Sequence, residues 1–280
     1  RYSVAIGHRA LMSEDSTDGV TAIGYQALVS QNQTGVTGNT GVGYQSIYNN
    51  VTGTKNTAVG WKALKGTGSQ SGSNITAIGS EALAVAYGQD NVAIGTQAGL
   101  LITSGVRNCL IGNNVGDAIT GTNYVTAVGI FAGSAINHTD ANGTTLLGYS
   151  AGLSITSGAG NTAVGYEALK TNVDGDRNTA VGYGALATHE ADTDGHGENS
   201  ALGYQAGGAI NTGTGNTLIG SRAGNQGTNN ITTGDNNTMI GVEAKASASA
   251  GTNQIVIGHS ATGIADNSVT LGNTATTKVY

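Results

Sequence analysis

The chain has 280 residues, of which 47 are glycine, 10% are charged and none is proline. One tryptophan and one phenylalanine exclude a thick core built around large aromatic side chains, and the Ala, Val, Ile and Leu residues predict a thin core instead. The net charge of −6, with Lys and Arg scattered singly, excludes the basic patch of a nucleic-acid-binding protein. Because no apolar run is long enough to span a bilayer, we expect no membrane insertion.

A short motif recurs along the whole chain, and each copy is anchored by a glycine that follows an aliphatic residue. The intervals between successive anchors vary little, and the last interval is the shortest. The 16 anchors are Gly7, Gly24, Gly43, Gly60, Gly79, Gly95, Gly112, Gly129, Gly148, Gly165, Gly182, Gly203, Gly220, Gly241, Gly258 and Gly272. Low complexity with fixed positions indicates a repeat fold rather than disorder.

Other positions recur with each anchor. The residue before the glycine is Val, Ile or Leu in all 16 copies, and the third residue after it is Ala in 14 copies. Asn stands four residues before the anchor in nine copies, and Thr stands three residues before it in ten. Length varies only in the polar stretch that returns to the next Asn, which is typical of loops.

These columns predict the architecture. Asn-Thr-Ala-Val reads as a short strand that follows a turn residue, the glycine as a bend, and the following Ala-Leu or Ala-Gly as a second short strand. A coil of about 17 residues cannot bury its own apolar side chains, so coils must stack with parallel, in-register pairing. The predicted fold class is all-β, a parallel β-solenoid (β-roll) of about 16 coils. It forms one repetitive domain over residues 1–280, with a short terminal repeat at 264–280.

Stacking places equivalent residues above one another as ladders. Asn ladders are expected to hydrogen-bond along the stack, and aromatic ladders are expected to stack face to face. The aromatic column after the anchor is either a structural ladder or a carbohydrate-stacking surface; it comprises Tyr25, Tyr44, Trp61, Tyr149, Tyr166, Tyr183 and Tyr204. The Thr column shares a strand face with the aliphatic column, and the sequence does not decide whether that face is the core or the surface.

Few positions hold side chains that could act in catalysis or in cofactor binding. Cys109 stands at a repeat position usually held by Thr, and we expect a small core residue rather than a reactive thiol. The five histidines have no repeated Ser or Cys partner, and a regular stack offers no cleft walls, so neither catalysis nor a cofactor is expected. One Thr per coil also falls short of the two per coil that an ice-binding surface requires.

The loop over residues 187–199 concentrates ionisable side chains. It is a candidate divalent-cation site or receptor-contacting loop, and the alternative is a solvated acidic excursion in a long repeat. Its ionisable residues are His189, Glu190, Asp192, Asp194, His196 and Glu198. Asp-x-Asp-Gly lacks the full spacing and the closing Glu of a calcium loop, so no metal site is predicted. The shorter acidic segment 172–176 reads as a turn.

Two kinds of repeat resemble known families. The segments 161–169 (NTAVGYEAL) and 178–186 (NTAVGYGAL) resemble repeats of phage tail-fibre proteins, which precede an endosialidase-type intramolecular chaperone domain in that family. The final segment 267–273 (NSVTLGN) is similar to repeats in the heads of trimeric bacterial autotransporter adhesins. The longer spacing of most copies implies a looser roll than in the adhesin head, and the chaperone domain is absent, so its autoproteolytic residues map to no position.

The resemblance implies a homotrimer in the virion tail or at the cell surface that recognises a host-surface glycan or protein receptor. The leading hypothesis is a phage tail fibre that mediates attachment to a bacterial host. The alternative is a bacterial cell-surface trimeric adhesin or extracellular filament. Since the aliphatic, Gly and Ala columns specify the stack, we expect any recognition to lie in the variable loops.

Overall fold

The computed structural model describes residues 2–13, 17–68, 71–190 and 197–276. The chain divides into two compact units, Arg1–Asn142 and Gly143–Tyr280. Both are all-β parallel solenoids, with about 15 turns in total, which confirms the predicted fold class. Within the described ranges, no helix is long and apolar enough to cross a membrane.

The first unit is built on one ladder of three-residue parallel strands, each one turn of the solenoid from the next. These strands are β1 (Val4–Ile6), β3 (Thr21–Ile23), β5 (Thr40–Val42), β6 (Thr57–Val59), β7 (Thr76–Ile78), β8 (Val92–Ile94), β9 (Cys109–Ile111) and β10 (Thr126–Val128). A second, two-residue pair near the N-terminus, which the repeat did not predict, consists of β2 (Thr17–Asp18) and β4 (Gly35–Val36). The unit ends with a short 3₁₀ turn, η1 (Thr139–Ala141).

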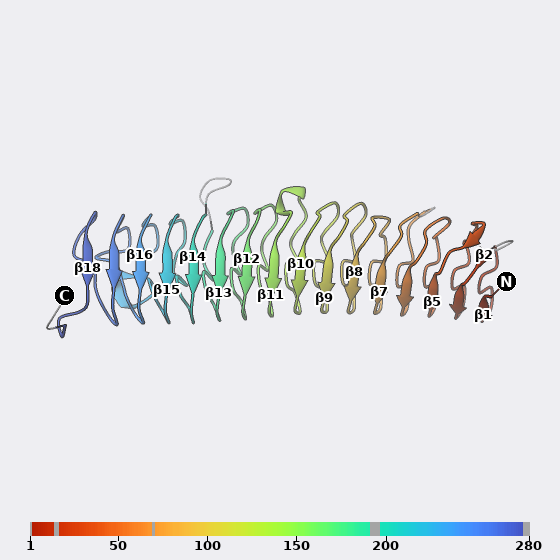
Figure 1. Cartoon of the computed structure of the whole chain (residues 1–280), viewed down its shortest axis with the longest axis horizontal. Coiled ribbons are helices and arrows are strands. Elements are labelled where there is room, and N and C mark those ends of the chain that lie inside the picture. The colour runs from red at the N-terminus through yellow and green to blue at the C-terminus, as the bar shows by residue number, and fades with distance from the viewer. Residues whose placement is uncertain (1, 14–16, 69–70, 191–196, 277–280) are drawn as a thin grey trace. The chain divides into compact units, whose positions relative to one another are not determined.

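The second unit repeats this plan, and Figure 1 shows its strand arrows pointing in the same direction. Its strands are β11 (Thr145–Leu147), β12 (Thr162–Val164), β13 (Thr179–Val181), β14 (Ser200–Leu202), β15 (Thr217–Ile219), β16 (Thr238–Ile240), β17 (Ile255–Ile257) and β18 (Val269–Leu271). A 3₁₀ turn, η2 (Gly227–Asn229), fills part of one of the longest repeats, between Gly220 and Gly241. The insertion therefore lies in a loop, as the sequence predicts.

The pairing register of the strands follows the sequence repeat. In β12 and β13, Thr162 pairs with Thr179 and Val164 with Val181, so each residue lies against its equivalent one turn away. The anchor glycines allow adjacent turns to come close enough for this pairing. Gly203 has φ of +141°, and a Cβ there would lie 2.6 Å from the carbonyl oxygen of Gly220 in the next turn. Any other residue at an anchor would push adjacent turns apart.

The predicted second strand is wrong, because Ala-Leu and Ala-Gly lie in turns. Glu167 and Leu169, on either side of Ala168, have φ of 52° and 54°, in the left-handed region that an extended strand does not use. Leucine in that region costs roughly 1–2 kcal/mol. Inter-turn hydrogen bonds offset the strain: the Glu167 amide donates to Tyr149 O at 2.9 Å and the Leu169 amide to Ala185 O at 3.0 Å.

The core is thin and consists of columns of small and medium apolar residues. In β3 and in β5 to β17 the middle residue points inward, as Ala163 does in β12, where it is completely buried. The turn after the anchor adds a buried Ala and Leu, and the return stretch adds a buried Ile in several coils. Examples of the three columns are Ala168, Leu169 and Ile155.

The predicted Asn ladder is confirmed, and it bonds mainly to backbone. Asn161 donates from Nδ2 to Gly175 O at 2.8 Å, and its Oδ1 accepts the Asn178 amide at 2.9 Å. Asn178 Oδ1 in turn accepts the Asn199 amide at 3.0 Å. The side chains of Asn161 and Asn178 thus bond to backbone groups of the following turn, and Asn161 Oδ1 supplies an acceptor to a buried amide. The ladder joins successive coils on the side where the loop enters the strand.

Candidate functional site

The aliphatic column that recurs in all 16 repeats points away from the core. The strand residues on either side of the buried middle position, such as Thr162 and Val164, are half-buried or exposed. Leu202 in β14 is 51% exposed and Ile219 in β15 is 39% exposed. Exposed members also include Val59, Ile78, Leu147, Ile257 and Leu271. The Thr column lies on the same outward face, so the structure resolves the ambiguity of the sequence.

An aromatic column runs beside the aliphatic one in both units. In the second unit the ring centroids of Tyr149, Tyr166, Tyr183 and Tyr204 are separated by 5.2, 4.9 and 5.4 Å, with interplanar angles of 6° to 20°. In the first unit the stack runs from His8 through Tyr25 and Tyr44 to Trp61. The negative charge of Glu167 raises the pKa of Tyr166.

Stacking determines what this column can bind. An internal ring such as Tyr166 has its two faces against Tyr149 and Tyr183, so only its edge and hydroxyl face outward. A sugar that stacks on an aromatic ring needs a free face. The geometry therefore favours the structural ladder over the carbohydrate-stacking surface for this column.

We name the outward aliphatic and aromatic columns of each unit the apolar face. Single exposed apolar residues are normal on a protein surface, but a row that repeats in every turn marks an interaction site. The sequence showed that these columns recur but did not show that they point outward. The sequence signal for this direction is the Ala or Gly that stands between the Thr column and the aliphatic column in ten of the 16 copies, because a thin core accommodates Ala more readily than Val or Ile.

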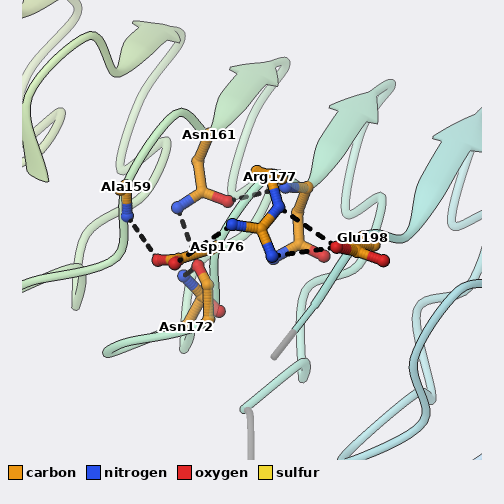
Figure 2. Close-up of polar contacts among 8 residues, drawn as sticks. Ala159, Asn161, Asn172, Asp176, Arg177 and Glu198 are labelled. Carbon is orange, nitrogen blue, oxygen red and sulfur yellow. Dashed lines mark hydrogen bonds and ion pairs between the residues drawn. The ribbon is translucent and has the colours of Figure 1, made fainter. Parts of the chain in front are cut away.

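The acidic loop is only partly within the described residues. Asp192, Asp194 and His196 lie outside them, and the structure describes His189, Glu190 and Glu198. Glu198 is exposed and lies at the opposite end of the loop from Glu190, where Arg177 donates to its Oε1 from Nε at 3.1 Å and from Nη2 at 2.8 Å. Figure 2 shows Arg177 between Asp176 and Glu198. Glu198 therefore takes part in an inter-turn ion pair.

His189 and Glu190 have different surroundings. The His189 side chain is completely buried, and its two ring nitrogens have no partner at hydrogen-bonding geometry within the described part of the chain. Burial lowers the pKa of His189 to about 4, against a smaller opposing effect of the Asn211 backbone. Glu190 Oε2 accepts the Val173 amide at 3.1 Å; burial raises the pKa of this carboxyl group, and the charge of Asp174 adds to the rise. His189 is thus a neutral core residue rather than a surface ligand.

The other candidate residues have structural rather than chemical roles. In the shorter acidic segment, Asp176 Oδ1 accepts the Ala159 amide at 2.7 Å, which is the role of a turn residue that bonds to the preceding coil (Figure 2). In the part of the chain that the structure describes, no three His, Cys, Asp or Glu side chains are arranged to hold a metal ion. Cys109 is half-buried in the outward Thr column of β9, so the prediction of a core residue is wrong.

The sequence also did not predict a hollow on the loop side of the first unit. It has a volume of about 280 Å³ and is lined by Tyr87, Gly88, Gln89, Asp90, Ser104, Val106 and Arg107. The sequence contains one indication of this hollow. Polar residues stand directly before the Asn-ladder position in three successive repeats, namely Asp90, Arg107 and Tyr124.

Comparisons with known proteins provide no further assignment. No protein-family model matches the chain, and no curated protein is significantly similar to it. The resemblance to tail-fibre and adhesin repeats thus rests on the repeat motifs alone.

Proposed function

We propose that the chain is a segment of a homotrimeric fibre, most consistent with a phage tail fibre that attaches the virion to the surface of its bacterial host. The observation that carries the proposal is the apolar face. A single chain leaves a row of Val, Ile and Leu side chains in water beside a stacked row of tyrosines, at a cost of about 25 cal/mol for each Å² of apolar surface.

Copies of the same chain are the partners that best fit this face. Each turn presents the same outward pair of residues, so a second copy in the same axial register presents an equally spaced row over each unit. Cyclic association of identical faces buries all the rows at once without creating an open-ended assembly. Three copies is the number that the tail-fibre resemblance implies.

The remaining surface fits a fibre that contacts a receptor. The regular columns form the stack and the apolar face, and the variation in repeat length is confined to the loops. Such a segment belongs in a virion tail or at a cell surface, and its external partner is a host-surface glycan or protein. The proposal includes no catalytic role, because the ionisable residues of the described loops serve the core and inter-turn ion pairs.

The second candidate is a bacterial cell-surface trimeric adhesin or extracellular filament. The observation that favours it is the final repeat, where β17 pairs with β18 across the shortest interval in the chain, the spacing that resembles adhesin heads. The sequence encoded after Tyr280 distinguishes the two. A chaperone domain there supports the fibre, and a membrane-anchor β-barrel region supports the adhesin.

Attachment itself is tested with fluorescently labelled chain and a panel of bacterial strains that differ in surface polysaccharide. We expect saturable binding to a subset of strains, and unlabelled chain should compete for it. Equal, non-saturable binding to every strain would contradict receptor recognition, as would no binding to any.

A further inference from the structure

The hollow on the loop side of the first unit is distinct from the apolar face. Its lining residues come from the return stretches that precede β8 and β9, and none of them belongs to a strand. A trimer that buries the strand face does not by itself require these residues. Its volume of about 280 Å³ is close to the lower limit for small-ligand sites, which suits a ligand of one or two rings.

Tyr87 lines this hollow with a half-exposed side chain. Its side chain is 48% exposed, and among the described residues its ring has no stacking partner. This distinguishes it from Tyr166, whose two faces are occupied by neighbouring rings. A half-exposed, unstacked tyrosine beside polar groups is the arrangement that binds a ligand with one apolar face and a polar periphery.

The polar groups of the hollow are held in place by neighbouring turns. Arg107 donates from Nη1 to Tyr124 Oη at 2.9 Å, and its guanidinium lies 5.7 Å from the centre of the Tyr124 ring. Asp90 accepts from Asn74 Nδ2 at 3.0 Å, and its other carboxylate oxygen lies 3.7 Å from Arg107 Nε. These contacts place a hydrogen-bond acceptor and a hydrogen-bond donor side by side at the hollow.

The charges of the hollow limit the ligand class. Asp90 and Arg107 are an ion pair, so the site has no uncompensated positive charge to attract a carboxylate, sulfate or phosphate. An acidic ligand would also approach the Asp90 carboxylate and be repelled. A neutral polyol has hydroxyl groups that donate to Asp90 and accept from Arg107, so both members of the pair are used.

We propose that this hollow binds a neutral hexopyranose residue of a surface polysaccharide. The C–H face of the sugar packs on the Tyr87 ring, and vicinal hydroxyls bond to Asp90 and Arg107. The inference rests on the proposed function, because it names the receptor class that an attachment fibre would contact. It locates recognition in the return stretches before β8 and β9, outside the acidic loop.

Saturation-transfer NMR with the methyl glycosides of glucose, galactose and mannose tests the proposal, with glucuronic acid as the acidic comparison. We expect at least one neutral glycoside to bind the chain with a dissociation constant on the order of millimolar, as is usual for a single small ring. Tyr87→Ala should weaken this binding at least tenfold, and Tyr87→Trp should retain it because the larger ring keeps the stacking face. Tyr2→Ala removes another exposed tyrosine and is the matched control, with no expected effect.

Several outcomes would overturn the proposal: no binding of any neutral glycoside, a preference for glucuronic acid, or equal binding by the Tyr87→Ala chain. Because the glycosides are small, these measurements do not depend on the oligomeric state. If the chain sediments as a trimer and binds cells while Tyr87→Ala binds them equally well, the hollow inference fails and the fibre proposal stands. If the chain sediments as a monomer yet binds a glycoside through Tyr87, the fibre proposal fails and the hollow inference stands.

Discussion

At the residue scale, His189 occupies a core position that five other coils fill with isoleucine. It is the seventh residue after its anchor glycine, Gly182, and the equivalent residues in several other coils are completely buried isoleucines. These are Ile102, Ile119, Ile136, Ile155 and Ile210. Because neither ring nitrogen has a partner at hydrogen-bonding geometry among the residues that the structure describes, protonation would place a charge in the core that no hydrogen bond compensates. His189 therefore makes stability depend on pH.

We expect His189→Ile to remove much of that dependence. The pKa of His189 is lowered from 6.5 to about 4 on folding, so the unfolded chain binds the extra proton between these values. Stability is then full above about pH 6.5, falls as the pH drops toward 4, and is lower by about 3 kcal/mol at the end of that window. Urea unfolding at pH 7.5 and pH 4.5 measures the change for both proteins.

Comparing the native chain with His189→Ile isolates the contribution of the His189 imidazole to the pH dependence of stability. Glu190, whose pKa is raised, is present in both and has the opposite dependence, since folding favours its protonated form. The free energy of unfolding of His189→Ile should therefore fall less on acidification than that of the native chain. Equal falls in the two proteins would show that His189 is not buried as a neutral group.

At the element scale, the Asn ladder joins each coil to the next, and Asn161→Ala tests its contribution. The substitution leaves the buried Asn178 amide without the Asn161 Oδ1 acceptor, while Gly175 O keeps its bond from Asn172. We expect a loss of about 2 kcal/mol in the free energy of unfolding, measured in urea. Asn211→Ala changes an exposed Asn of the same unit and should alter stability by less than about 0.5 kcal/mol. Equal effects of the two changes would contradict a structural ladder.

The sequence predicts some features of each coil better than others. The constant spacing of aliphatic residue and glycine predicts the parallel register, because each residue in a stack must lie on its equivalent. The turn after the anchor is not predicted by the sequence, since nothing in a leucine indicates that its φ is positive. Only the backbone of adjacent turns, which accepts the Leu169 amide, makes that conformation acceptable.

The direction of the strand side chains was harder to predict for a physical reason. Larger aliphatic residues usually point inward, but here Ala163 lies in the core and Val164 lies outside it. The middle residue is Ala or Gly in most turns, but Leu110, Leu146 and Leu218 are completely buried at the same position, so residue size alone does not predict the direction of the side chain. The candidate loop was partly predicted as a polar excursion, but the burial of His189 depends on its alignment with the isoleucine column.

At the scale of the whole molecule, the exposed aliphatic and aromatic columns are explained if copies of the chain cover them. Sedimentation equilibrium of the purified chain tests this most directly, with Leu202→Asp as the interface variant and Asn211→Asp as a charge-matched control away from the apolar face. We predict three times the chain mass of 27.7 kDa for the native chain and the control. Leu202→Asp should dissociate to monomers that retain the native circular dichroism spectrum, because Leu202 points outward and is 51% exposed. A native chain that sediments at 27.7 kDa, or a Leu202→Asp chain that remains a trimer, would contradict the account.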